Sequence, residues 1–142
     1  MKLSAGGARG ERWRRLEELL EQRKLHWRKL LEKAEKWAEE LADQLERKGV
    51  TVEYIVLFGS VARGDHVEDS DLDFIIVSRS RQGMEVEERL SLLYRLWDKP
   101  RDATFIPLTP SELVRLRDKS ITVAEALRDG IIIYKRGRVE KI

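Results

Sequence analysis

The segment from Glu11 to Lys48 contains neither proline nor glycine, and no other feature of the sequence constrains the fold as strongly. Apolar residues recur within it at intervals of three or four, which places them on one face of a helix. They are Trp13, Leu16, Leu20, Trp27, Leu30, Ala34, Trp37 and Leu41. Gly49 follows where a glycine commonly ends a helix. The pattern predicts one long amphipathic helix over residues 11–48.

A helix of this length cannot pack along all of its face on one small domain. At 1.5 Å per residue it is about 57 Å long, which exceeds the width of such a domain. Its C-terminal half, from Leu30 to Leu45, leads directly into the first predicted strand and is expected to pack on the domain. The apolar residues of its first half, Trp13 to Trp27, then need a partner, either another protein or a second copy of this chain.

The remaining sequence divides into a short lead-in and one domain. Residues 1–10 hold three glycines and little to bury, so we expect them to be disordered. Residues 49–142 alternate predicted strands with predicted helices, which indicates one α/β or α+β domain. The fold expected is a short mixed β-sheet with flanking helices in two or three layers, preceded by the long N-terminal helix.

The predicted elements of this domain follow from its apolar runs and its helix signals. Thr109 and Thr122 each precede a glutamate by three residues, the pattern of a capping box, so each is predicted to open a helix. A further helix is predicted from Met84 to Trp97. The predicted strands are Val52–Phe58, Asp71–Val77, Ala103–Leu108 and Ile131–Tyr134.

Composition excludes several classes of function. Lys and Arg number 28 against 26 Asp and Glu, so the near balance of charge argues against a broad basic surface for nucleic acid. The chain has no cysteine, which excludes disulfides, thiolate metal sites and a cysteine nucleophile. It has no apolar run of about 20 residues and no signal-peptide core, so we expect a soluble, cytoplasmic protein. The absence of asparagine beside many charged residues is typical of proteins that work at high temperature.

Two aspartates and a glycine-serine pair are the candidate catalytic and binding residues. Asp71 and Asp73 are two residues apart at the start of a predicted strand, so both carboxylates should point to one face. Two carboxylates this close favour a bound cation, and oxygen ligands suit Mg²⁺ or Mn²⁺ better than zinc. Gly59 allows close approach of a ligand to the backbone, and Ser60 offers a hydroxyl and an N–H to a phosphate. Asp102, at the start of the next strand, is the nearest candidate for a third carboxylate.

The spacing Gly-Ser, ten residues, Asp-x-Asp resembles the signature of minimal, polymerase-β-like nucleotidyltransferases. Arg63-Gly64 and Ser70 match as well, and the resemblance extends over about residues 50–134. It implies that Gly59 and Ser60 bind a nucleoside triphosphate, with Arg63 and Ser70 beside them. It also implies that Asp71 and Asp73 ligate Mg²⁺ or Mn²⁺, while a third aspartate helps to activate the attacking hydroxyl. The implied reaction is transfer of a nucleoside monophosphate, AMP from ATP, to a hydroxyl with release of pyrophosphate.

The resemblance also implies a partner. Proteins of this minimal kind resemble the antitoxin half of a toxin–antitoxin pair, whose other half is a helical HEPN protein with an acceptor tyrosine. The alternative is a binding module of another class, which retains nucleotide affinity, lacks the chemistry and acts by blocking a helical partner. One departure from the family pattern bears on this choice. The third aspartate of the family falls at Thr104 here, two residues after Asp102.

Several residues have a structural interpretation beside the functional one. Arg63 could meet a phosphate or pair with Glu68 or Asp69. We expect His66 and His26 to be solvated side chains rather than metal ligands. The four tryptophans are expected in the core or at an interface rather than as platforms that stack on bases.

Overall fold

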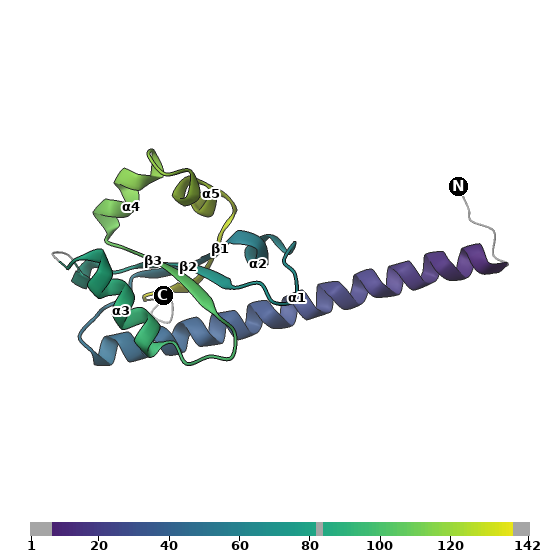
Figure 1. The fold of residues 1–142 in the computed structure, drawn as a ribbon, viewed down its shortest axis with the longest axis horizontal. Helices are drawn as coiled ribbons and strands as arrows, with labels where there is room; N and C mark the ends of the chain where they lie inside the picture. Colours follow the sequence, from purple (N-terminus) through teal and green to yellow (C-terminus); the bar gives the residue numbers. More distant parts are fainter. Residues whose placement is uncertain (1–6, 82–83, 138–142) are drawn as a thin grey trace.

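A computed structural model describes residues 7–81 and 84–137, and the strands of these residues form one mixed sheet in the order β3-β2-β1-β4 (Figure 1). β1 pairs antiparallel with both β2 and β4, whereas β2 and β3 run parallel. The bounds are Tyr54–Phe58 for β1, Leu72–Val77 for β2, Ala103–Leu108 for β3 and Ile131–Lys135 for β4.

Helices cover both faces of the sheet, so the domain has three layers. α1 and α3 lie on one face, and α4 and α5 lie on the other (Figure 1). This arrangement confirms the predicted short mixed sheet with flanking helices and a long N-terminal helix. The bounds are Gly7–Arg47 for α1, Gly59–Arg63 for α2, Val86–Leu96 for α3, Pro110–Arg117 for α4 and Ile121–Asp129 for α5, with a 3₁₀ turn at Arg79–Arg81.

The alternation of side chains along the strands builds one apolar cluster on each face. Ile55 and Leu57 of β1 face α1, whereas Val56 between them faces α4 and α5. On the α1 side, stacked Phe74 and Phe105 rings 5.9 Å apart contact Trp97, which in turn contacts Trp37. Trp37 and Trp97 are therefore core residues, as predicted.

The helix α1 is buried only along its C-terminal half. Leu30 is its first buried apolar residue, and Ala34, Ala38, Leu41 and Leu45 continue the buried stripe. The N-terminal part of the helix projects beyond the domain (Figure 1), and apolar side chains there are exposed, as Trp13 at 53% illustrates. Trp27, closer to the domain, is half-buried. The prediction that the second half packs on the domain is confirmed. The prediction that Trp27 belongs to an unpartnered first half was wrong, because its indole N–H donates to the Val61 carbonyl of α2 at 2.7 Å.

Several predicted boundaries were wrong by one to four residues, among them the start of β1, which lies at Tyr54 instead of Val52. α1 begins at Gly7, inside the predicted disordered lead-in, because an existing helix extends without a new nucleation cost; residues 1–6 of that lead-in lie outside the described part. β2 begins at Leu72, so Asp71 lies just before the strand. The cap of α5 is Ser120, not Thr122, because the Ser120 hydroxyl accepts the Val123 N–H at 3.2 Å.

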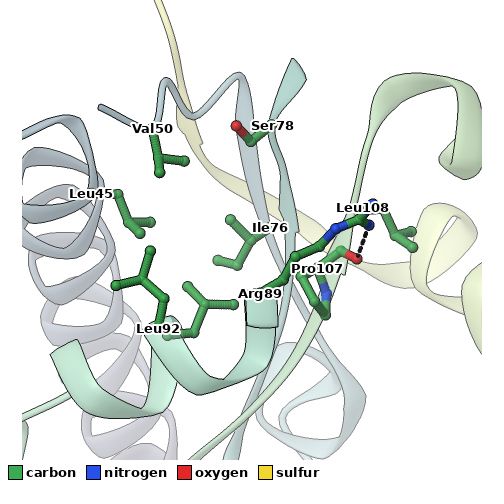
Figure 2. A pocket seen from close by; sticks show the side chains of 9 residues that line it. Leu45, Val50, Ile76, Ser78, Arg89, Leu92, Pro107 and Leu108 are labelled. Atoms are coloured by element: carbon green, nitrogen blue, oxygen red, sulfur yellow. Dashed lines mark hydrogen bonds between the residues drawn. The ribbon is translucent and has the colours of Figure 1, made fainter. Parts of the chain in front are cut away.

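A buried arginine links α3 to the opposite layer. Arg89 is only 5% exposed, and its guanidinium donates to Glu112 of α4 at 2.6 Å and to the Pro107 carbonyl at 3.3 Å. Figure 2 shows Arg89 crossing beside Ile76 at a small cavity of about 20 Å³, room for about one water molecule. Glu112 also completes the predicted capping box with Thr109, so this pair fixes the start of α4.

None of the helices in the described residues is both long and apolar enough to cross a lipid bilayer.

Candidate nucleotide and metal site

The Asp73 carboxylate lies against Gly59, at the point where β1 ends and α2 begins. Asp73 pairs with Phe58 in the antiparallel register of β1 and β2, which brings its side chain beside the next residue, Gly59. A Cβ at Gly59 would come within 2.3 Å of Asp73 Oδ2. The Gly59 φ of +79° is also one that side chains disfavour. Glycine is therefore required here by the carboxylate as well as by the backbone.

Asp71 joins Asp73 on the same side of the sheet. Leu72 and Phe74, which alternate with them, are fully buried on the α1 side. The two carboxylates are close enough to interact, because burial and then the negative charge of Asp71 raise the pKa of Asp73 above its ordinary value. The structure thus brings together the two aspartates predicted as metal ligands, with Asp71 exposed and Asp73 half-buried.

Ser60 and Arg63 of α2 stand beside these carboxylates. Arg63 acts on Asp73 through its positive charge, which lowers the pKa of that carboxyl against the larger opposing effects of burial and Asp71. Its guanidinium also pairs with Asp65 at 3.1 Å, rather than with Glu68 or Asp69, the two partners considered from the sequence. Within the described residues, the Ser60 hydroxyl makes no hydrogen bond to protein, so it remains available to a ligand.

Ser70 has a structural role in the loop that leads to Asp71. Its hydroxyl accepts the Val67 N–H at 3.0 Å, and its N–H donates to the Val67 carbonyl at 3.1 Å, which closes a tight turn. Its carbonyl accepts a hydrogen bond from Arg101 at 2.6 Å. Ser70 thus fixes the approach of the chain to Asp71.

Thr104, rather than Asp102, lies opposite Asp73. The parallel register of β2 and β3 pairs Asp73 with Thr104, whose hydroxyl forms a hydrogen bond that lowers the pKa of the Asp73 carboxyl. Asp102 is exposed just before β3, and its carbonyl accepts the Leu72 N–H at 3.0 Å. Across residues 7–81 and 84–137, no three acidic or histidine side chains gather closely enough to hold a metal ion. Asp102 as a third metal ligand stays a prediction.

The contact between α1 and this site could not be found from the sequence. Trp27 Nε1–H donates to the Val61 carbonyl at 2.7 Å, and its ring packs on Gly64, where a Cβ would lie 3.2 Å from the ring. Arg23 donates to the His66 carbonyl at 3.0 Å. These residues are more than 30 positions apart along the chain, and no local pattern signals their contact. Trp27 is therefore an internal anchor, not part of an open partner face.

The donor set suits a divalent cation that brings its other ligands with it. The Asp71 and Asp73 carboxylates repel each other, because the charge of Asp71 raises the pKa of Asp73, so a bound cation would stabilise the pair. Mg²⁺ is commonly bound by one or two carboxylates plus waters and substrate phosphates. The chemistry of the two carboxylates therefore fits a divalent cation of this kind.

The sequence and the fold both have known relatives. A family model described as "Polymerase beta, Nucleotidyltransferase" matches residues 39–138. No curated protein sequence matches the chain significantly.

Two solved structures resemble the fold. A Sulfolobus solfataricus protein described as a candidate nucleotidyltransferase superposes with a TM-score of 0.59 at 24% identity, covering 82% of this chain and 89% of that one. A toxin–antitoxin structure with AMP-PNP is more distant, with a TM-score of 0.41 and 18% identity over 75% of this chain and 77% of that one. The first likeness supports the fold, and the second carries no conclusion about this chain.

Proposed function

Because this chain belongs to the polymerase beta nucleotidyltransferase family, we propose that it transfers AMP from ATP to a hydroxyl group. In this reaction the acceptor oxygen attacks the α-phosphorus, the bond from that phosphorus to pyrophosphate breaks, and the acceptor proton passes to a base. Because ATP is the proposed substrate, we infer that the protein acts in the cytoplasm.

The pairing of Asp71 and Asp73 against Gly59 is the observation that carries this proposal. A bound Mg²⁺ or Mn²⁺ would neutralise charge on the triphosphate and on the leaving pyrophosphate. The chain contributes the two carboxylates that hold the cation and the Gly59–Ser60 backbone that approaches the phosphates. Arg63, already beside Asp73, supplies a positive charge to the same phosphates.

Asp102 is the carboxylate that we assign to the acceptor proton. It is exposed, and it precedes Thr104 by two residues, so strand alternation gives both side chains the same direction. One strand repeat of roughly 6.6 Å separates positions 102 and 104, so the proposal requires the acceptor hydroxyl to bind between Asp102 and Asp73.

The acceptor in this proposal is a tyrosine of a helical HEPN-type protein. The support for a protein partner is the projecting part of α1, where Trp13, Leu16 and Leu20 are each about half exposed. A second copy of this chain could cover the same face, which would make the protein a homo-oligomer. Removing residues 1–22 would leave the Trp27 anchor intact, so loss of complex formation in that variant would locate the partner on this face.

Label transfer tests the proposal directly. The purified chain is incubated with Mg²⁺, with ATP labelled on the α-phosphate and with the helical protein that is encoded beside it. The mass of each protein is then measured. A gain of one AMP on a partner tyrosine is expected, and Asp71→Asn should abolish it. Asp43→Asn, an exposed carboxylate on α1, serves as the matched control and should transfer normally. Transfer that survives Asp71→Asn would contradict the proposed site.

A second function is favoured by Thr104. Because a threonine stands opposite Asp73 where the family pattern has a carboxylate, the chain could bind Mg²⁺ and ATP without transferring AMP, and act by blocking its partner. Calorimetry separates the two functions. Tight binding of Mg²⁺ and ATP with no transfer from any nucleoside triphosphate supports the binding module, whereas transfer that is lost in Asp102→Ala with binding retained supports the enzyme.

A further inference from the structure

The fold gathers positive charge in a groove between α1 and the loop of residues 65–70. This basic groove has a volume of about 500 Å³. One acidic residue, Glu68, lies among the residues that line it. Its basic lining residues are Arg23, His26, Lys29, Lys33, His66 and Arg101.

The two arginines of the basic groove are held in place on opposite walls. Arg23 of α1 donates to the carbonyls of His66 at 3.0 Å and of Gly64 at 3.4 Å. Arg101, just before β3, donates to the Ser70 carbonyl at 2.6 Å. Since a carbonyl takes up only part of each guanidinium, donors remain on both side chains for a ligand. These cations are therefore built into the groove rather than free on the surface.

The lysines continue the positive charge along α1. Arg23, His26, Lys29 and Lys33 follow each other at helical intervals of three or four, so they form one line along the helix. Within the described residues, neither Lys29 nor Lys33 takes part in an ion pair. Between Arg23 and Lys33 this line extends for roughly 15 Å at 1.5 Å per residue. A ligand with several negative charges in a row would match it.

We propose that the basic groove binds the phosphate backbone of a single-stranded nucleic acid. Lysine is depleted at protein interfaces but is a common phosphate contact, which favours a phosphate chain over an acidic protein segment. Walls on two sides suit one strand, because a positively charged groove that follows a backbone is how such strands are bound. The chain has a nearly neutral total charge, but folding places its cations together here.

Two residues connect the basic groove to the candidate site along the chain. Arg101 is adjacent to Asp102 in the chain, and the Ser70 carbonyl that it contacts is adjacent to Asp71. This inference goes beyond the proposed AMP transfer, and it requires neither metal nor ATP.

Fluorescence anisotropy tests the inference without metal or ATP, so failure of AMP transfer would not affect it. The probe is a labelled single-stranded RNA of about 12 nucleotides, within the roughly 4–16 that one small binding domain covers. If Arg23, Lys29, Lys33 and Arg101 each contact one phosphate, the slope of log affinity against log salt should be about −3. Lys29→Glu with Lys33→Glu should weaken binding by at least about tenfold, and the slope should become shallower by about 1.4, because two phosphate contacts are lost.

Lys36→Glu with Arg47→Glu provides the matched control, because it makes the same charge change at exposed positions of α1 outside the basic groove. This control should bind RNA with no more than about a twofold change. If the glutamate variant fails to fold, as judged by circular dichroism, Lys29→Gln with Lys33→Gln replaces it and should weaken binding in the same direction. The inference would be overturned if the Lys29 and Lys33 variant bound RNA as tightly as wild type. It would also be overturned if polyglutamate displaced the RNA at an equal concentration of charges.

Discussion

Thr104 stands directly opposite Asp73 across the parallel pair β2 and β3, and its hydroxyl forms a hydrogen bond with the Asp73 carboxyl. Thr104→Asp would therefore place a third carboxylate beside Asp71 and Asp73. We expect Mn²⁺ binding in the presence of ATP to tighten on the order of tenfold, about 1.4 kcal/mol, because ligand charge increases. Calorimetry and the electron paramagnetic resonance of bound Mn²⁺ measure this. Thr104→Asn, which adds no charge, is the control, and equal Mn²⁺ affinity of both variants would argue against a metal at this position.

Gly59 and Gly49 form a matched pair for testing the carboxylate contact. Both have a positive φ, +79° and +86°, but a Cβ at Gly49 has nothing within 4 Å, whereas one at Gly59 collides with Asp73. Alanine at either position should cost about 1–2 kcal/mol of stability for the backbone alone. Only Gly59→Ala should also displace Asp73 and abolish binding of Mg²⁺ and ATP. Thermal melts and calorimetry on both variants check this, and unchanged nucleotide binding in Gly59→Ala would contradict it.

Trp27→Phe tests the anchor between α1 and α2. The change removes the 2.7 Å hydrogen bond to the Val61 carbonyl, which still accepts the Gly64 N–H at 3.2 Å, so we expect a loss of roughly 1 kcal/mol. ATP affinity should fall as well, because Val61 follows Ser60 in the same short helix. Trp13→Phe at an exposed position is the control and should melt like wild type. Identical ATP affinity in Trp27→Phe and wild type would show that the anchor does not support the site.

Asp73→Asn should stabilise the protein at neutral pH in the absence of metal. Burial and the charge of Asp71 raise the pKa of Asp73, so the folded chain holds this proton more tightly than the unfolded chain. That stability is fully present below the ordinary aspartate pKa of about 3.9 and is lost as the pH rises through the folded value. The melting temperature of Asp73→Asn should thus exceed that of wild type at pH 7 but not at low pH.

Metal addition gives the second half of this test. Mg²⁺ with ATP should raise the melting temperature of wild type and leave Asp73→Asn unchanged, because binding to the folded state alone stabilises it. Asp43→Asn should behave like wild type in both conditions. A lower melting temperature for Asp73→Asn at pH 7 without metal would contradict the repulsion between the two carboxylates.

Arg89→Met should destabilise the protein strongly. Loss of the guanidinium removes the hydrogen bonds to Glu112, which are the largest cause of the lowered Glu112 pKa. Breaking a buried pair costs roughly 3–5 kcal/mol, and we expect about 2–3 here because Glu112 is partly solvated. The lowered pKa contributes stability that is lost as the pH falls through the folded value, so the variant should depend less on pH in acid. Denaturant unfolding measures this, and Arg89→Met with Glu112→Gln should recover part of the loss.

Local patterns predicted the features that lie close together in the chain. The alternation of Asp71 and Asp73 with buried Leu72 and Phe74 was visible in the sequence, as was the capping box of Thr109 and Glu112. The requirement for glycine at position 59 could not be predicted, because it depends on the register of β1 against β2, which joins residues from different segments.

Long-range packing produced the features that could not be predicted. In the sequence, Trp27 cannot be distinguished from the other apolar residues of the helix face. Its role as an anchor depends on the packing of α1 on α2. The basic groove likewise combines Arg23 with Arg101, and a total charge near zero conceals it. The start of α1 at Gly7 was missed because helix propagation overrode the local effect of the glycines.

The anchoring of α1 at Trp27 divides one continuous helix into two segments with different opening behaviour. From Leu30 to Leu45 one face of α1 is part of the buried core, so we expect the amide hydrogens of this segment to exchange with solvent through large-scale unfolding. Those of residues 10–22 have no core beneath them and are protected only by the helix itself, which is marginal at this length. In free solution the projecting segment therefore frays and reforms rapidly while the domain stays closed, and any partner that binds there must first immobilise it.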